Sequence, residues 1–131
     1  MKLASGVQIR DNAFYGCSNL SKVDNIKHCS YIGSDAFAEC RSLKNLDVSG
    51  AEHIGGYAFY NTSLETLKLG NAQIEPYDLN SETLFGTAKS TLRKVTIPSG
   101  WYVPSGLFSS CSNLVVVYNL AYATGIGNMA F

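Results

Sequence analysis

The sequence predicts a repeat solenoid, a chain that coils around one axis and lays equivalent strands side by side. One pattern, I-G-x-x-A-F-x-x-C-x-x-L-x-x-L-x-V, recurs from end to end and is most complete in residues 32–48. Its opening aliphatic residue returns every 20 to 29 residues, at Ile9, Ile32, Ile54, Ile74, Val103 and Ile126. Self-similarity at this period, with leucine and valine at fixed offsets, is the signature of a leucine-rich solenoid.

Two spacings hold the repeats in register. The aromatic residue follows the opening aliphatic by five residues in copies one, two, three, five and six, and a leucine precedes the next aliphatic by three in the five complete copies. Copy four differs, because Glu75 to Leu84 carries a six-residue insertion before Phe85. We therefore expect a single domain over residues 1–131, with repeats from about 9, 32, 54, 74 and 103 and a truncated sixth from 126.

Alternation of apolar and polar residues places the strands. Residues 46–48, 67–69 and 95–97 each put two apolar side chains on one face and a polar one on the other. In copies one and five the second aliphatic comes one residue later, so a bulge or a shorter strand is expected there. The segment from Ile-Gly to Cys is too short for more than one helical turn and should form an irregular or 3-10 outer side.

The recurring aromatic and leucine positions predict the core. We expect one continuous buried stack along the axis, with leucines beside it, made of Phe14, Phe37, Phe59, Phe85 and Phe108 with Leu20, Leu43, Leu64, Leu92 and Leu114.

Composition excludes several classes of protein. Charged residues make up only 15% of the chain and the formal net charge is zero, whereas nucleic-acid binding favours clustered lysine and arginine. The longest purely apolar runs are far too short to span a bilayer. Residues 1–6 contain a lysine but no apolar segment behind it, so no signal peptide is visible.

The four cysteines are interpreted as structural rather than metal-binding. Cys17, Cys40 and Cys111 each follow the repeat aromatic by three residues, so they should form one inward row, with Thr62 and Ala88 in the same place in copies three and four. No C-x-x-C pair occurs, and metal ligands must converge. The alternative is a disulfide between Cys17 and Cys40 in adjacent coils. Cys29 lies outside the row and is expected to be the exposed thiol.

No residue set indicates catalysis or a cofactor. His28 and His53 lack a surrounding nucleophile and carboxylate, and no glycine-rich phosphate loop is present. Asp24 and Asp47 fall at equivalent strand positions and should be neighbours. A calcium site between them is conceivable, but two carboxylates are few for that ion, and a solvated face is the other interpretation.

Tyrosine and tryptophan give the main surface signal. Eight tyrosines and one tryptophan exceed what the inward phenylalanine row uses, and aromatic residues with a polar tip are enriched at recognition surfaces. The alternative is that tyrosines simply cover the outer turns. The positions that the repeat does not require to be apolar are Tyr57, Tyr60, Tyr77, Tyr102, Tyr118 and Tyr122.

The repeat pattern resembles the BspA-type leucine-rich repeat over nearly the whole chain. Copies one, two, three and five match it well, and copy four departs most, with Leu84 for the alanine and Ala88 for the cysteine. The resemblance implies a right-handed coil with parallel strands on a concave face. It also implies a protein of the cell surface or a secreted protein, because members of this class are often exported and implicated in adhesion.

These observations lead to a non-enzymatic module that binds a protein or glycan partner, with a structural spacer or self-assembling segment as the alternative. The expected contact surface is two columns of outward strand residues on the concave face, with Trp101, Tyr102 and the 75–84 insertion beside it. The columns contain Lys22, Asp24, Asn45, Asp47, Thr66, Lys68, Lys94, Thr96, Val116 and Tyr118. Of these and their neighbours, the predicted binding residues are Asp24, Asn45, Asp47, Thr66, Lys68, Thr96, Tyr118 and Trp101.

The two ends of the repeat array carry a separate expectation. Neither end shows a polar capping segment in the sequence, and solenoids need capped ends for solubility. We expect that the segment either belongs to a longer array or associates end to end.

Overall fold

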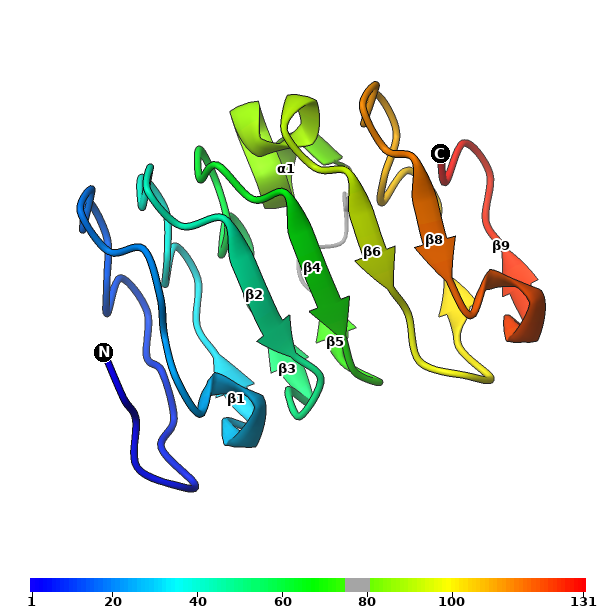
Figure 1. Ribbon diagram of the computed structural model, residues 1–131. Coiled ribbons are helices and arrows are strands. Elements are labelled where there is room, and N and C mark those ends of the chain that lie inside the picture. Colours follow the sequence, from blue (N-terminus) through cyan, green and yellow to red (C-terminus); the bar gives the residue numbers. More distant parts are fainter. Residues whose placement is uncertain (75–80) are drawn as a thin grey trace.

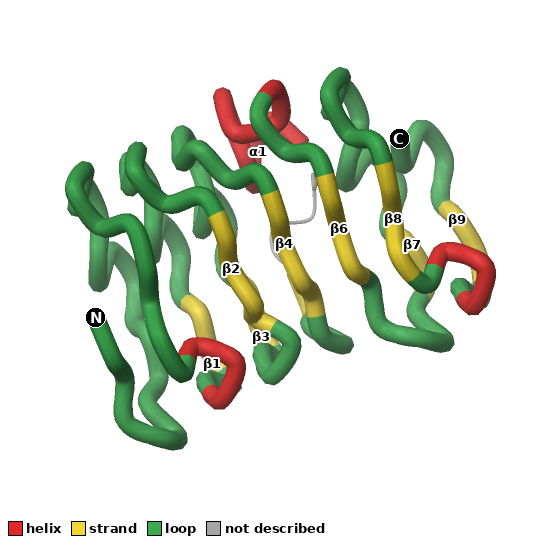
Figure 2. The backbone as a smooth tube through the Cα atoms, in the orientation of Figure 1, coloured by secondary structure: helices red, strands yellow, loops and turns green. Residues whose placement is uncertain are grey.

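The computed structural model describes residues 1–74 and 81–131. The chain forms a right-handed coil whose turns stack along one axis, with the N-terminus at one end and the C-terminus at the other (Figure 1). Each turn passes through a front layer and a back layer and encloses apolar side chains between them (Figure 2). The predicted solenoid class is confirmed.

The front layer is one parallel sheet. Its strands are β2 (Asn45–Val48), β4 (Thr66–Leu69), β6 (Lys94–Thr96) and β8 (Val116–Tyr118), in the order β2-β4-β6-β8. Burial alternates along β2 and β4 as the period of two predicts, so their aliphatic residues point into the coil. The outward side of these four strands is called the four-stranded face below.

Copies one and five accommodate their extra residue with an asparagine. Asn25 and Asn119 adopt left-handed backbone angles, with φ of 68° and 69°, and each is followed by a 3-10 helix, η1 (Ile26–His28) or η3 (Leu120–Tyr122). Each asparagine side chain donates from Nδ2 to a carbonyl oxygen of the preceding coil at 3.0 Å. Strand β8 has three residues where β2 and β4 have four, as expected, but β6 in copy four is equally short, so the extra residue is not the only reason for a short strand.

The back layer contains short parallel strands that the sequence pattern did not predict. They are β1 (Tyr31–Ile32), β3 (His53–Ile54) and β5 (Gln73–Ile74) in one sheet, and β7 (Tyr102–Val103) with β9 (Gly125–Ile126) in another. Ile32 and Ile54 are fully buried, whereas the rings of Tyr31 and His53 stack at 4.6 Å. Two residues per strand leave no room for an alternating pattern, which is why the pattern alone did not reveal them.

The outer side beyond these strands consists of irregular turns, as predicted. The third residue after the opening aliphatic has positive φ in five coils, at Asn12, Asp35, Tyr57, Gly106 and Met129. The turns are tied together by backbone hydrogen bonds between coils, because the third and fifth residues after the aliphatic donate to the coil that follows. In coil one these bonds are Asn12 N–H to Ser34 O at 2.9 Å and Phe14 N–H to Ala36 O at 2.8 Å.

Copy four replaces its outer turn with helix α1 (Ser81–Phe85) and 3-10 helix η2 (Gly86–Ser90). Residues 75–80 of the insertion lie outside the described residues. The insertion was expected to border the concave face or the rim beside it. Helix α1 does not border the face itself, because Leu84 and Phe85 accept backbone hydrogen bonds from Phe59 and Asn61 of the outer turn that follows β3. Leu84 and Phe85 are fully buried, so burial of these two apolar side chains holds α1 there.

A stack of phenylalanine rings runs along the whole axis. The rings of Phe14, Phe37, Phe59, Phe85, Phe108 and Phe131 follow one another with centroid separations of 5.2, 6.5, 6.4, 6.0 and 5.6 Å. Phe37, Phe59 and Phe85 have no exposed surface. The predicted core stack is confirmed in these central coils, and it extends to Phe131 at the C-terminal end, while Phe14 is only partly buried.

The cysteines depart from their predicted burial in three places, one of which is Cys111, because it is only partly buried. Cys40 is buried, and Thr62 and Ala88 are buried in the same row. Cys17 is exposed, because only one neighbouring coil covers it, and Cys29 is fully buried, so both of these expectations were wrong. Cys29 belongs to a different row, of buried residues two or three positions before each opening aliphatic, with Ala51 and Ala72. All four thiols are free.

One of the four thiols should therefore react quickly with a thiol reagent, and the other three should react slowly. Burial raises the pKa of Cys29, and raises the pKa of Cys40 and of Cys111 to about 11. We expect Cys17 to react with a thiol reagent within seconds to minutes and the other three only after denaturation. Because the folded-state pKa values lie above the unfolded ones, stability should fall as the pH rises from 9 toward 11. Stopped-time thiol titration with Cys17→Ser as the control checks this, and fast labelling of two or more thiols would contradict it.

Candidate functional site

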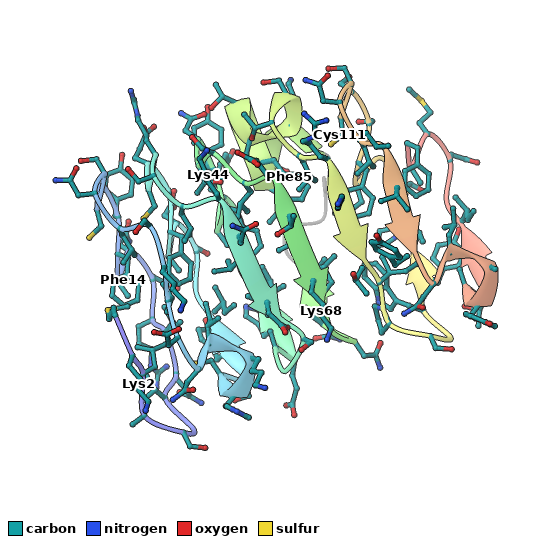
Figure 3. All side chains as sticks on the ribbon, in the orientation of Figure 1. Lys2, Phe14, Lys44, Lys68, Phe85 and Cys111 are labelled. Carbon is teal, nitrogen blue, oxygen red and sulfur yellow. The ribbon has the colours of Figure 1, made fainter. Side chains whose placement is uncertain are left out.

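The four-stranded face carries two columns of outward side chains in strict register. Cα pairing across the sheet aligns Asn45, Thr66, Lys94 and Val116 in one column, and Asp47, Lys68, Thr96 and Tyr118 in the other. In Figure 3 the side chain of Lys68 projects from the front of β4, while Phe85 lies between the two layers. The sequence predicted both columns with these members.

The columns border a hollow on this face. It has a volume of about 510 Å³ and is lined by outward residues of β2, β4, β6 and β8, by the inward residues Leu46 and Leu67, and by residues 21–23. Six of the predicted binding residues line it, and they are Asn45, Asp47, Thr66, Lys68, Thr96 and Tyr118. Tyr118 stands at the C-terminal side of the hollow with half of its surface exposed.

Polar side chains on the face contact one another across the strands. The Thr66 hydroxyl donates to Asn45 Oδ1 at 2.6 Å, and Lys68 Nζ lies 3.8 Å from Asp47 Oδ2. Lys44 and Glu65 form an ion pair of 3.0 Å beside the start of β2 and β4. Exposed pairs of this kind contribute at most about 1 kcal/mol each, so a partner can replace them at little energetic cost.

Asp47 is held as a carboxylate by its surroundings. Partial burial alone would raise its pKa, but hydrogen bonds from Ser49 and the positive charges of Lys68 and Lys27 outweigh that effect and lower the pKa. The Ser49 N–H donates to Asp47 Oδ1 at 3.1 Å. The Asp47 side chain therefore offers a fixed negative charge in the hollow at neutral pH.

Lys94 differs from the other lysines of this region. Lys22, Lys44 and Lys68 each form an ion pair, whereas within residues 1–74 and 81–131 no acidic partner is found for Lys94. Its neighbours in the column are Thr66 and Val116, which carry no charge. The sequence placed Lys94 in the column but not among the predicted binding residues, because a missing ion pair can be recognised only from the folded arrangement.

Asp24 lies at the edge of this face rather than in the hollow. It pairs with Lys2 in an isolated parallel bridge, and its side chain lies 3.0 Å from Lys22 Nζ. A hydrogen bond from Lys22 lowers the pKa of Asp24. Asp24 and Asp47 each have their own lysine partner, and in the described part of the chain no group of three His, Cys, Asp or Glu residues is placed to hold a metal ion.

Trp101 does not lie on the surface where it was expected. Only 8% of it is exposed, and it belongs to the core cluster. It lies two residues before Val103, in the row of buried turn residues that also contains Cys29 and Ala51. Burial of its large apolar ring against the core stabilises the fold. Trp101 is therefore not available to a partner on the four-stranded face.

The outer turns expose the other aromatic residues. Tyr57 is 42% exposed and contacts Tyr60 edge to face at 5.5 Å. On the back layer Arg10 lies over the ring of Tyr31, 5.8 Å from its centroid. The pair Tyr57 and Tyr60 and the pair Arg10 and Tyr31 lie on different coils, and none of these four side chains lines the hollow of the front sheet. Tyr77 lies outside the described residues.

Comparison with known proteins identifies the repeat. A family model described as "BspA type Leucine rich repeat region" matches residues 7–131 with six copies. The chain belongs to the BspA-type leucine-rich repeat family. Residues 9–131, from the first opening aliphatic to the last phenylalanine, are therefore BspA-type repeats, as the resemblance implied.

Among solved structures, the chain is similar to a T. pallidum leucine-rich repeat protein, TpLRR. The two share 22% sequence identity with a TM-score of 0.58, over 97% of this chain and 72% of that one. This likeness shows the leucine-rich repeat fold. A comparison with curated proteins found no match. No helix in the described part of the chain is long and apolar enough to cross a membrane.

The family and the geometry together indicate an interaction module. BspA-type repeats build a scaffold that presents side chains at a regular spacing. On the four-stranded face these side chains form two columns, and each column takes one residue from each of the four strands. The lining of the hollow is a mixture of three lysines, a carboxylate, hydroxyl and amide groups and one tyrosine ring. That mixture suits contact with a polar surface of another molecule.

Proposed function

We propose that this chain is a non-enzymatic binding module whose four-stranded face contacts a protein or glycan partner. The hollow of about 510 Å³ lined by the two columns carries the proposal. Solenoid proteins commonly bind partners over the regular face that their stacked strands create. Surface display or secretion follows as part of the proposal, because BspA-type repeats are often found in surface-associated proteins.

Three features of the face support recognition of a polar partner. Lys94 offers a charge without an ion pair in the described structure, so binding an acidic or hydroxyl-rich group there breaks no existing contact. Tyr118 supplies an exposed ring with a polar tip at the side of the hollow. Asp47 supplies a fixed negative charge on the neighbouring column. Complementarity to both signs gives specificity rather than long-range attraction.

Binding should depend on the columns and not on the outer turns. We expect Tyr118→Ala and Asp47→Ala each to weaken binding at least about tenfold, because each removes a side chain that lines the hollow and would contact the partner there. The measurement is titration of the fluorescently labelled domain on cell monolayers and on a glycan array. Loss of binding after protease treatment of the cells, or after glycosidase treatment, distinguishes a protein from a glycan partner.

Variants of tyrosines on the outer turns provide the control. Tyr15→Ala and Tyr60→Ala lie on the outer turns and should leave the affinity unchanged. Thermal unfolding of every variant verifies that the fold is intact. If the column variants bind normally and the outer-turn variants do not, the four-stranded face is not the binding surface.

A structural role without a ligand is the second candidate function. The observation that favours it is the continuous ring stack through the central coils, which makes the solenoid a regular scaffold whatever its outward residues are. A purely structural or self-assembling segment would show no saturable binding in the experiment above.

A further inference from the structure

A third row of solvent-accessible residues lies at the start of the front strands. Backbone hydrogen bonds align this row across the coils, because the Glu65 N–H donates to Lys44 O at 2.7 Å and the Arg93 N–H donates to Glu65 O at 2.9 Å. The Val115 N–H in turn donates to Arg93 O at 2.8 Å. Each of the four residues directly precedes one residue of the first column. Lys44, Glu65, Arg93 and Val115 are called the rim row below, and Figure 3 shows Lys44 beside the start of β2.

Positive charge is in excess on this side of the molecule, although the chain as a whole carries equal numbers of both signs. The rim row and the two columns contain four cations and two carboxylates, and both carboxylates already lie beside a lysine. The two cations that remain are Arg93 and Lys94, which are adjacent in the chain. For neither of them is an acidic partner found within residues 1–74 and 81–131. A carboxylate from another molecule can therefore pair with them without breaking an existing ion pair.

Apolar side chains lie beside these two cations in the next coil. Val116 is the Cα partner of Lys94, and Val115 follows Arg93 in the rim row. Adjacent strands are about 4.8 Å apart, so each valine is a direct neighbour of its cation, and Figure 1 shows β6 and β8 side by side. Val115 is 74% exposed and Tyr118 is 50% exposed, so covering them removes apolar area from water and favours association. Arg93, Lys94, Val115, Val116 and Tyr118 are called the β6–β8 patch below.

The exposure of the patch follows from its outward positions. Lys44 and Glu65 occupy the place of Val115 in coils that have a neighbour on each side, and their side chains are still 60% and 43% exposed. Lys68 occupies the place of Tyr118 between two coils, and its side chain is 52% exposed. Outward residues of this face therefore stay accessible wherever they lie along the stack.

We infer that the β6–β8 patch binds an extended acidic segment of another protein. Carboxylates of the segment contact the two cations, and its apolar side chains cover the two valines and the tyrosine ring. This inference rests on the proposed function, because it names the partner of the same face. It concerns the half of the face that β6 and β8 form.

The spacing of the patch fits an extended peptide that lies between β6 and β8. Successive side chains of an extended chain point to opposite sides, and every second one repeats at roughly 6.6–6.8 Å. Lys94 and Thr96 on β6 are two positions apart, as are Val116 and Tyr118 on β8, so both strands present side chains with this repeat. A segment in which acidic and apolar residues alternate directs its carboxylates toward β6 and its apolar side chains toward β8. The guanidinium of Arg93 can donate two parallel hydrogen bonds to one carboxylate.

Other anionic macromolecules fit the patch less well. A nucleic acid carries a phosphate on every nucleotide and is bound through many lysines and arginines, whereas this patch has two cations. A sulfated glycan presents no aliphatic side chain to cover Val115 and Val116. The Asp47 carboxylate opposes an acidic segment only weakly, because it lies beside Lys68 on β2, two strands and roughly 10 Å away from β6.

Fluorescence anisotropy with two labelled peptides tests the inference. In the first peptide glutamate alternates with valine and phenylalanine, and in the second glutamate alternates with serine. The first should bind with a Kd of about 10–500 μM, and the second at least about fivefold more weakly, because it leaves the apolar side chains uncovered. Raising NaCl from about 50 mM to about 500 mM should weaken the first complex at least about threefold, since salt screens the contacts between charges.

Charge reversal locates the site. Arg93→Glu and Lys94→Glu should each weaken binding of the first peptide at least about tenfold, because a like charge then faces the carboxylates. Both side chains are exposed, so the fold should survive, and thermal unfolding verifies this. Arg10→Glu is the matched control, because it changes the net charge equally but lies on the back layer over the ring of Tyr31. It should leave the affinity for the peptide unchanged.

The opposite results overturn the inference. Failure of the first peptide to bind up to about 1 mM excludes an acidic segment at this patch, and so does equal affinity of the unmodified chain and both charge-reversal variants. Equal or tighter binding of the serine peptide, or of heparin as a sulfated-glycan probe, shows a site for polyanions in general. Such a site would not select a protein segment with apolar side chains.

Titration on cells separates this inference from the proposed function. Lys94→Glu should weaken cell binding at least about tenfold, as Tyr118→Ala should. If Tyr118→Ala weakens cell binding and Lys94→Glu does not, the face has a partner but not an acidic one, so the inference fails and the proposed function stands. If neither substitution changes cell binding, the proposed function fails and the inference fails with it.

Discussion

Replacing Phe59 with alanine should lower the free energy of unfolding by about 3–5 kcal/mol. Phe59 is fully buried, and its ring lies between those of Phe37 and Phe85 at 6.5 and 6.4 Å. The substitution removes the transfer free energy of a large apolar side chain and leaves a cavity. The turns on both sides are fixed by hydrogen bonds between coils, so the cavity cannot collapse.

Urea denaturation followed by circular dichroism measures this loss. Phe131→Ala is the matched control, because the same ring at the C-terminal end is 46% exposed and has one ring neighbour, Phe108. Phe131→Ala should lower the free energy of unfolding by about half as much or less, since the hydrophobic contribution scales with the apolar area removed from water. A midpoint unchanged in Phe59→Ala would mean that the ring stack does not stabilise the coil.

Adding a single methyl group at Gly55 should destabilise the fold by about 1–3 kcal/mol. A Cβ atom there would lie 2.4 Å from Ser34 N and 2.7 Å from Gly33 C, both in the backbone of the preceding coil. The Gly55 N–H also donates to Ile32 O at 2.8 Å, so the two coils cannot move apart without losing that bond. The glycine of the Ile-Gly motif is thus required by the close approach of two backbones.

Gly16 offers a control for Gly55→Ala in the same denaturation experiment. Its backbone has φ of 71°, and a Cβ atom there would meet nothing within 4 Å. Asparagine tolerates this left-handed conformation, so Gly16→Asn should change the stability by no more than about 1 kcal/mol. Equal losses in the two variants would contradict the close-approach explanation. The first coil, at the N-terminal end of the stack, carries Arg10 in place of the motif glycine.

The close stacking of coils also explains how the candidate site is formed. Adjacent parallel strands lie about 4.8 Å apart, so one outward side chain per coil produces a column with fixed spacing. Asp47, Lys68, Thr96 and Tyr118 are separated by 21, 28 and 22 residues in the sequence, and the register places them in a row. The surface can therefore vary residue by residue while the inward row remains apolar.

Repeat spacing alone determined the larger part of the fold. The interval between opening aliphatics and the alternation in residues 46–48 and 67–69 predicted the front strands, their register and the two outward columns. They did so because neighbouring coils have the same backbone path, so equal offsets become neighbours in space. The central ring stack through Phe37, Phe59 and Phe85 followed for the same reason.

The tertiary structure decided how deeply each residue is buried, and which charges lie beside it, in its own coil. Cys17 and Cys40 share one place in the motif, yet Cys17 is exposed at the first coil and Cys40 is buried between two coils. Trp101 and Cys29 lie in turns where no residue type recurs from one repeat to the next, and contact with the core buries them. The ion pairs of Lys44 with Glu65 and of Lys68 with Asp47 join side chains from different coils, and no such pair forms at Lys94 in the described structure. A one-dimensional pattern records offsets, whereas burial and charge pairing depend on which neighbours are present on each side.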